Sequence, residues 1–240
     1  MQIKIQVHSD CELTLPLGHH HIQQAVVYSL MSSEMGGTPL HDTGYAYGKR
    51  QYKLFTFGPV TGEHTVQDKR ITYTGDFGFE LRTPDSEVIE TIRANLREKG
   101  IRFGDHVYRD MEAEVDDREI AEERITVKML SPVCVYATNP GTRHTNYFTP
   151  HQDLFCEAVV QNAMRKFTAA YGQTPEGELK FMPYKVGSRD KILTRYKSMI
   201  IEAYMGIYRL AGDPFLLTFL YNTGLGAKNS QGFGMFEVIG

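Results

Sequence analysis

The sequence predicts an α+β fold in which two halves of the chain repeat one order of helices and strands. Three observations predict it. Apolar and polar residues alternate along stretches such as 2–7 and 124–130, as they do in half-buried strands. Apolar residues recur at helical spacing along 18–33 and 150–171. Glycine and proline separate these stretches and mark turns between them.

The first half is predicted to open with a strand and a helix and to close with a helix and a strand. Its second helix has Pro84 and Asp85 at its start and Gly100 beyond its end, which are typical start and stop signals. The predicted elements are a strand at 2–7, a helix at 18–33, a Gly-rich connection at 35–48, strands at 51–57, 65–74 and 77–83, a helix at 84–99 and a strand at 101–113.

The second half repeats this order without a visible repeat in the sequence itself. The predicted elements are strands at 124–130 and 143–148, a helix at 150–171, strands at 178–186 and 192–210, a helix at 213–222 and a strand at 235–239. This order is that of the split βαβ, or ferredoxin-like, domain. We therefore predict two tandem ferredoxin-like domains, residues 1–117 and 118–240.

The charge distribution agrees with a boundary near residue 117. Residues 1–124 hold 14 Lys and Arg against 21 Asp and Glu, whereas residues 125–240 hold 12 against 8. Much of the acid lies in 110–123, which we interpret as a solvated face or a linker. The second half therefore offers the better surface for a polyanion.

Composition predicts a cytoplasmic protein. The three cysteines are odd in number and share no metal-ligand spacing, which indicates reduced thiols. The amino end alternates like a strand and does not resemble a secretory signal. Because no apolar run reaches membrane-spanning length, no membrane association is expected.

No metal or cofactor is predicted. The nine histidines show no HExxH-type spacing. The adjacent His19, His20 and His21 would point about 100° apart on a helix, so all three cannot bind one metal ion. We expect this triplet to be exposed to solvent.

The segment 180–197 combines positive charge with aromatic rings. It holds six Lys or Arg residues and one Asp, with Phe181, Tyr184 and Tyr196 among them. This mixture suits RNA, because cations meet phosphates and bases stack on rings. A solvated hairpin is the alternative. The predicted RNA-binding residues of this segment are Lys185, Arg189, Lys191, Arg195 and Lys197.

The tail 224–234 carries two Gly-x-Gly pairs around five residues that include one lysine. Glycine allows close backbone approach to a ligand, and exposed N–H groups beside a lysine suit a phosphate. The order of helix, loop and strand fits neither a P-loop nor a dinucleotide fingerprint. A helix C-cap followed by a turn is the alternative. The predicted phosphate-binding residues are Gly224, Gly226, Lys228, Asn229, Ser230, Gly232 and Gly234.

The tail GLGAKNSQGFGMFEV resembles the terminal signature of the CRISPR-associated endoribonucleases that cut precursor CRISPR RNA within each repeat. In the first half, LPL at 15–17 and the following HHHIQQAVVYSLM are similar to the start of that family's first helix. LHD at 40–42 and KLFTF at 53–57 resemble its histidine loop and the next strand. Residues 60–175 match only in their order of elements.

The resemblance implies metal-independent cleavage by the RNA's own 2′-hydroxyl, which leaves a 2′,3′-cyclic phosphate and a 5′-hydroxyl. Such chemistry needs an acid, a base and a cation near the phosphate. The family pattern assigns His41 as general base or acid, Tyr28 as its partner and Lys53 as the stabiliser of the transition state. Lys49 and Arg50 are close enough in sequence to supply the same charge.

Tyr28 is expected on the outer side of the first helix. A helical wheel groups it with His21 and Gln24, from where it can reach the loop that carries His41. The residues predicted to face the core are Ile22, Ala25, Val26, Ser29 and Leu30.

Repeat RNA is the partner that the resemblance implies, with other CRISPR-associated effector proteins as further partners and a homodimer as an open option. Two alternative functions stay open. One is a protein that holds repeat RNA without cutting it, although the presence of His41 argues against this. The other is a metal-dependent enzyme that uses the acidic run and histidines, which cleavage in EDTA would exclude.

Overall fold

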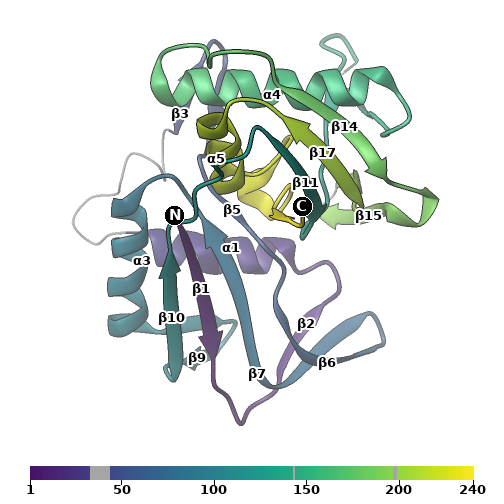
Figure 1. Ribbon diagram of the computed structural model, residues 1–240. Helices are drawn as coiled ribbons and strands as arrows, with labels where there is room; N and C mark the ends of the chain where they lie inside the picture. The colour runs from purple at the N-terminus through teal and green to yellow at the C-terminus, as the bar shows by residue number, and fades with distance from the viewer. Residues whose placement is uncertain (33–43, 143, 197–198) are drawn as a thin grey trace.

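The computed structural model describes residues 1–32, 44–142, 144–196 and 199–240, and it contains two sheet domains that lie one above the other in Figure 1. Each domain has a mixed set of helices and antiparallel strands. No helix of the described residues is both long and apolar enough to cross a membrane. All three cysteines are free thiols.

The first domain has the strand order β10-β1-β7-β6. Its strands are β1 (Gln2–Val7), β2 (Leu13–Pro16), β5 (Thr56–Phe57), β6 (Thr61–Gln67), β7 (Arg70–Arg82) and β10 (Met111–Asp116). The short strands β2 and β5 also pair with β7. Its helices, α1 (His20–Met31) and α3 (Ser86–Lys99), contact each other, and α1 passes behind β1 and β7 in Figure 1.

The second domain repeats this arrangement with the strand order β18-β11-β17-β14. Its sheet strands are β11 (Arg124–Met129), β14 (Lys180–Lys185), β17 (Ile207–Ala211) and β18 (Phe236–Val238), and its helices are α4 (Asp153–Tyr171) and α5 (Pro214–Thr223). In the first domain β1 lies between β10 and β7, and in the second domain β11 lies between β18 and β17. A split βαβ requires this placement of its first strand. The prediction of two tandem ferredoxin-like domains is confirmed.

Within the described ranges, four small hairpins and two short 3-10 turns accompany these sheets. The hairpins are β3 (Tyr45–Tyr47) with β4 (Arg50–Tyr52), β8 (Ile101–Phe103) with β9 (His106–Tyr108), β12 (Tyr136–Thr138) with β13 (Thr145–Tyr147), and β15 (Lys191–Tyr196) with β16 (Met199–Tyr204). The 3-10 turns are η1 (Ser188–Asp190) and η2 (Asn229–Gln231).

Several predicted strand limits were wrong because the turns lie elsewhere. The chain reverses at Asp68 and Lys69, which take positive φ angles of 49° and 61°, so 65–74 is not one strand. β7 instead runs unbroken from Arg70 to Arg82. The predicted strands 101–113 and 192–210 each divide into three, since turns such as that at Gly104 interrupt them.

The signals for α3 were read correctly. Asp85 is the N-cap, and its side chain accepts a hydrogen bond of 2.9 Å from the backbone N–H of Glu87. Gly100 ends the helix with a φ of 71°. These two residues fix the helix length, as their residue types predicted.

The buried face of α1 differs from the predicted one. Ala25 and Ser29 are exposed, and the buried residues of the helix are Gln23, Val26, Val27, Leu30 and Met31. The buried Gln23 donates a hydrogen bond of 2.7 Å to the carbonyl of Gly58. A helix can bury a polar side chain when it has such a partner, which a pattern of apolar residues does not reveal.

The acidic run lies at the surface, as predicted. β10 is the outer strand of the first sheet, and its Glu112, Glu114 and Asp116 are exposed. The second sheet starts at Arg124 with β11, and we keep residues 1–117 and 118–240 as the proposed domains. The cores are not fully separate, since Tyr52 and Leu54 pack in the core of the second domain.

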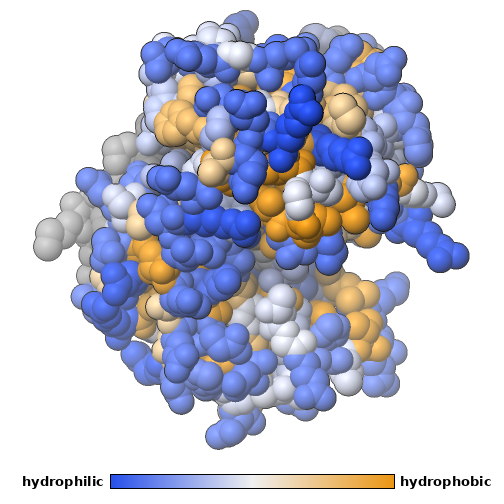
Figure 2. Space-filling view, viewed as in Figure 1, coloured by the Kyte–Doolittle hydropathy of each residue, from blue (hydrophilic) through white to orange (hydrophobic). Residues whose placement is uncertain are grey.

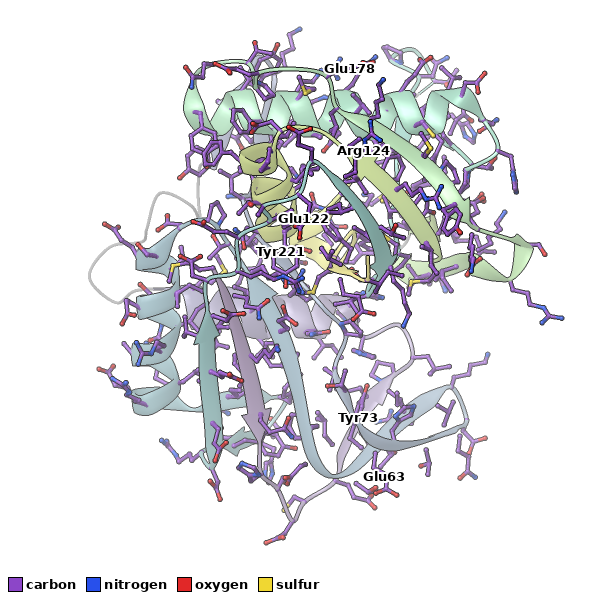
Figure 3. The ribbon with its side chains drawn as sticks, viewed as in Figure 1. Glu63, Tyr73, Glu122, Arg124, Glu178 and Tyr221 are labelled. Carbon is purple, nitrogen blue, oxygen red and sulfur yellow. The ribbon has the colours of Figure 1, made fainter. Side chains whose placement is uncertain are left out.

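Arg82 ties the two domains together. Its buried guanidinium is 2.5 Å from a carboxylate oxygen of Glu80 and donates a 2.6 Å hydrogen bond to the carbonyl of Phe236. It also lies 3.7 Å from the ring centre of Tyr221, which Figure 3 shows at the junction of the domains. Figure 2 shows this face as mostly hydrophilic, with an apolar patch where the two sheets approach each other.

Replacing Arg82 with Met should lower the free energy of unfolding by about 3 kcal/mol, because Glu80 is left with an unpaired and largely buried charge. Urea unfolding of parent and variant measures this loss. Arg93→Met is the matched control, since the Arg93–Glu90 pair is largely solvated and should change stability by less than about 0.5 kcal/mol. Equal losses in the two variants would contradict this role of Arg82.

Candidate functional site

The glycine tail folds back beneath α5 and is largely buried. Gly224, Gly226, Gly232 and Gly234 are all buried and have positive φ angles between 67° and 85°. A Cβ on Gly234 would stand 2.0 Å from the carbonyl oxygen of Leu225, so no larger residue fits there. These glycines were expected to bring backbone close to a ligand. The structure shows that they bring it close to other parts of the protein.

A buried lysine holds the tail in place. The Lys166 ammonium, on α4, donates hydrogen bonds to the carbonyls of Thr223 and Gly224 (3.2 and 2.5 Å) and to Oδ1 of Asn229 (3.1 Å). Burial lowers the pKa of Lys166 to about 7, while three oxygen acceptors match the three N–H donors of the ammonium. Sequence reasoning missed this residue, because Lys166 follows Arg165 on a helix and looks like any solvated cation.

Asn229 is the second anchor of the tail. Its Nδ2 donates to the carbonyls of Leu225 (2.9 Å) and Phe233 (3.0 Å), while its Oδ1 accepts from Lys166. The side chain is buried, and these bonds occupy its amide. The structure therefore gives the Asn229 side chain a role within the fold, although its backbone remains next to a cleft.

The outer side of the tail forms one wall of a cleft of about 620 Å³ between the domains. Opposite it lie the β3–β4 hairpin, β12 and α4. The basic side chains of the wall are Arg50, Lys53, Arg165, Lys166 and Lys228. None of the described residues that line the cleft is acidic, so its potential favours an anion.

Of the predicted tail residues, Gly226, Lys228, Asn229 and Ser230 line this cleft. The Lys228 ammonium lies 5.1 Å from the ring centre of Tyr136, a cation–π contact that holds it at the opening. The carbonyl of Ser230 accepts a 2.7 Å hydrogen bond from Gln24 of α1. The tail is therefore bonded to the first domain at the edge of the cleft.

Two of the three predicted catalytic residues lie beside this cleft, and His41 lies outside the described residues. Lys53 and Arg50 both line it, whereas Lys49 does not. Tyr28 is half-buried rather than free of the core, and its ring meets Phe55 edge-on at 5.6 Å. Burial raises the pKa of Tyr28, which a hydrogen bond with the Ser230 side chain partly offsets. Tyr28 thus contacts the tail directly.

The described part of the predicted basic segment lies on β14, η1 and β15. Lys185, Arg189, Lys191 and Arg195 are exposed, and Lys197 lies outside the described residues. Lys191 pairs with Glu202 at 2.8 Å. These cations do not line the cleft, but the Tyr196 hydroxyl bonds to Gln24 and fixes the hairpin beside α1.

The histidine triplet is less exposed than predicted. His20 is half-buried, and its ring stacks on Phe233 of the tail at 5.3 Å. Burial lowers the pKa of His20 to about 4, so it is neutral near pH 7. His19 bonds to the carbonyl of Pro16, while His21 is exposed. In the described part of the chain, no three His, Cys, Asp or Glu side chains are grouped as a metal site.

The fold and this cleft define a protein of two tandem ferredoxin-like domains with a basic site at their junction. Residues 114–238, more than half of the chain, match the sequence model of the family described as CRISPR associated protein Cas6, C-terminal. The chain belongs to the Cas6 family.

Similar proteins also carry the Cas6 name. The chain is 26% identical over 251 residues to the CRISPR-associated endoribonuclease Cas6 1 of Methanocaldococcus jannaschii, with 98% of this chain and 91% of that protein covered. It is 26% identical over 238 residues to the CRISPR-associated endoribonuclease Cas6 of Pyrococcus furiosus, with 96% and 86% covered. A match over 51% of each chain is to a putative endoribonuclease-like protein, Cas6nc, of Pyrococcus horikoshii, also 26% identical.

Solved structures share the fold. A CRISPR associated protein Cas6 superposes with a TM-score of 0.77 at 22% identity, over 100% of this chain and 99% of the other. An RAMP protein binding different RNA substrates gives 0.77 at 19% identity over the whole of both chains. A Cas6 product complex gives 0.68 at 17% identity over 99% of each.

The buried ammonium predicts a pH-dependent stability. Because the pKa of Lys166 is about 7 in the fold and an ordinary 10.5 in the unfolded chain, the unfolded state binds more protons above pH 7. The free energy of unfolding should therefore rise with pH from about 7 to 8.5, by at most about 1.4 kcal/mol per unit. Lys166→Met should lack this rise, so the difference between variant and parent isolates Lys166. Parallel stability curves for the two proteins would contradict the assignment.

Proposed function

We propose that this protein is a metal-independent endoribonuclease that cuts precursor CRISPR RNA within its repeats. The 2′-hydroxyl before the cut attacks the adjacent phosphate and leaves 2′,3′-cyclic phosphate and 5′-hydroxyl ends. The observation that carries the proposal is the meeting of three distant chain segments at one acid-free cleft. Lys53 and Lys228 line it, and Tyr28 contacts Ser230 in its wall.

The side chains suit different steps of this reaction. A histidine with an ordinary pKa near 6.5 can accept or donate a proton near neutral pH, and we assign this role to His41. Tyr28 keeps its proton because burial raises its pKa, so its hydroxyl acts as a hydrogen-bond or proton donor. Lys53 supplies positive charge for the phosphate in the transition state, with Arg50 beside it in the wall.

The tail is proposed to hold the RNA backbone. Lys228 and Ser230 present an ammonium and a hydroxyl at the cleft. The backbone N–H groups of Lys228, Asn229 and Ser230 have no acceptor among the described residues. Phosphate oxygens are suitable acceptors for all of these donors. Gly224, Gly226, Gly232 and Gly234 support this site by shaping the tail.

The β15–β16 hairpin extends the proposed RNA surface. Lys191 and Arg195 are exposed on β15, and Tyr196 fixes the hairpin beside α1. Lys185 at the end of β14 and Arg189 in η1 are exposed just before it. Exposed cations such as Lys185, Arg189 and Arg195 can neutralise phosphates outside the cleft, whereas Lys191 is already paired with Glu202. Lys197 continues the same run in sequence.

A non-catalytic repeat-binding protein is the second candidate, because two relatives, from Pyrococcus horikoshii and Pyrococcus furiosus, are named only endoribonuclease-like. The two candidates share the RNA site and differ in whether the RNA is cut. Other CRISPR-associated effector proteins and a second copy of the chain are proposed partners in either case, and the cytoplasm is the proposed location.

Cleavage of unmodified repeat RNA decides between these two functions, and a single 2′-deoxy substitution tests the mechanism. We expect end-labelled repeat RNA to be cut at one position in excess EDTA, and the same RNA with a 2′-deoxy nucleotide at the cut to bind but stay intact. Gel analysis with phosphatase-treated markers identifies the cyclic phosphate end. Binding without any cutting would support the non-catalytic candidate, and cutting of the deoxy RNA would exclude attack by the 2′-hydroxyl.

His41→Ala and Lys228→Ala should separate chemistry from binding. Loss of His41 should slow single-turnover cleavage by about 10²- to 10⁴-fold with little change in Kd. Loss of Lys228 should weaken binding and reduce the slope of log Kd against log salt by about 1. Arg97→Ala, on the exposed side of α3, is the control and should change neither. A Lys228→Ala protein that binds as tightly as the parent would remove Lys228 from the phosphate site.

A further inference from the structure

Three buried polar atoms without partners surround the cleft. Among the described residues, the buried side-chain oxygens or nitrogens with no hydrogen bond are the Tyr52 hydroxyl, Oδ1 of Asn162 and Oε1 of Gln231. All three residues line this one cleft, although they come from β4, α4 and η2. Unpaired buried polar atoms are costly and few in native proteins. Their concentration at one site indicates a ligand that completes their bonds.

The chemistry of these atoms defines the ligand class. Two are amide carbonyl oxygens that accept hydrogen bonds, and the third is a hydroxyl that can donate or accept one. A phosphate has only acceptors, so it would leave the carbonyl oxygens unpaired. The edge of a nucleobase carries amino and ring N–H donors as well as acceptors. An amide turned by 180° swaps acceptor for donor, so this geometry defines a base edge and not which base.

The rest of the wall also fits a base. Tyr136 and Phe148 line the same cleft and offer flat rings on which bases stack. Its volume of about 620 Å³ is in the range that encloses a small ligand such as a nucleotide. Arg50 and Arg165 share the wall and carry guanidinium groups that suit the phosphates on either side of a bound base.

We propose that Tyr52, Asn162 and Gln231 form a base-reading subsite that holds one nucleobase of the repeat beside the cut. This subsite rests on the proposed function, because Lys53, Lys228 and Ser230 must hold the RNA backbone in the same cleft. It makes cleavage depend on the identity of one nucleotide next to the cut.

Substitutions in the subsite should change the base preference of cleavage without lowering Tm. Tyr52→Phe removes a hydroxyl that has no hydrogen-bond partner among the described residues, so Tm should stay the same or rise. The same change should weaken the preference for the natural base at one flanking position by about tenfold. A hydroxyl with a purely structural role would show the reverse, with a lower Tm and an unchanged preference.

Tyr73→Phe is the matched control. The Tyr73 hydroxyl is buried and donates a 3.0 Å hydrogen bond to the carbonyl of Val60. Figure 3 shows Tyr73 toward the far end of the first domain, away from the domain junction where Tyr221 lies. This variant should lose stability and keep the full base preference of the parent.

The experiment measures single-turnover cleavage of repeat RNAs in which each nucleotide flanking the cut is replaced in turn by the other bases. The parent should discriminate at one position, and Tyr52→Phe, Asn162→Leu and Gln231→Met should each lose much of that discrimination with no loss of Tm. RNAs with single 2′-deoxy changes at the flanking nucleotides separate base contacts from contacts to ribose. Equal base discrimination by parent and all three variants would overturn the subsite, as would a loss confined to the 2′-deoxy series. Failure of the parent to cut any repeat RNA would instead overturn the proposed function.

Discussion

The ammonium of Lys166 must find three acceptors in the interior of the second domain, and much of the site depends on this requirement. Its acceptors come from the end of α5 and from Asn229, so the tail has to pass directly over α4. That path is too tight for side chains at Gly226 and Gly234, whose added Cβ atoms would stand 2.6 and 2.0 Å from carbonyl oxygens. The glycines therefore allow the tight path of the tail, and the hydrogen bonds of Lys166 hold the tail on that path.

The second domain alone does not complete the site. α1 contributes Tyr28 and Gln24, which bond to Ser230, and the segment after β4 contributes Lys53. Arg82 of β7 fixes the position of the two domains relative to each other, because it bonds to Phe236 of β18 and contacts the ring of Tyr221. The candidate site therefore depends on contacts between the two domains.

The sequence predicted the ferredoxin-like order and the importance of the tail, because both depend on local patterns. Helix ends such as Asp85 and Gly100 are also local signals. The role of Lys166 could not be predicted, since its acceptors lie 57 to 63 residues away. The sequence also did not show that the tail glycines face the interior of the protein. A glycine motif indicates that the backbone needs an unusual conformation, but it does not indicate which part of the protein or which ligand lies next to it. Tyr28 was predicted to lie on the outer side of α1, but it is half-buried, since its contact with Phe55 depends on tertiary packing.

The acidic outer strand β10 has an effect on what can approach the molecule. Strand edges present unpaired backbone groups that another chain can join, and like charges on both edges oppose such pairing. Glu112, Glu114 and Asp116 would face their own copies if two molecules joined their first sheets at this edge. The same carboxylates repel a polyanion. The charge of this strand therefore opposes both the pairing of two molecules at this edge and the approach of a polyanion from this side.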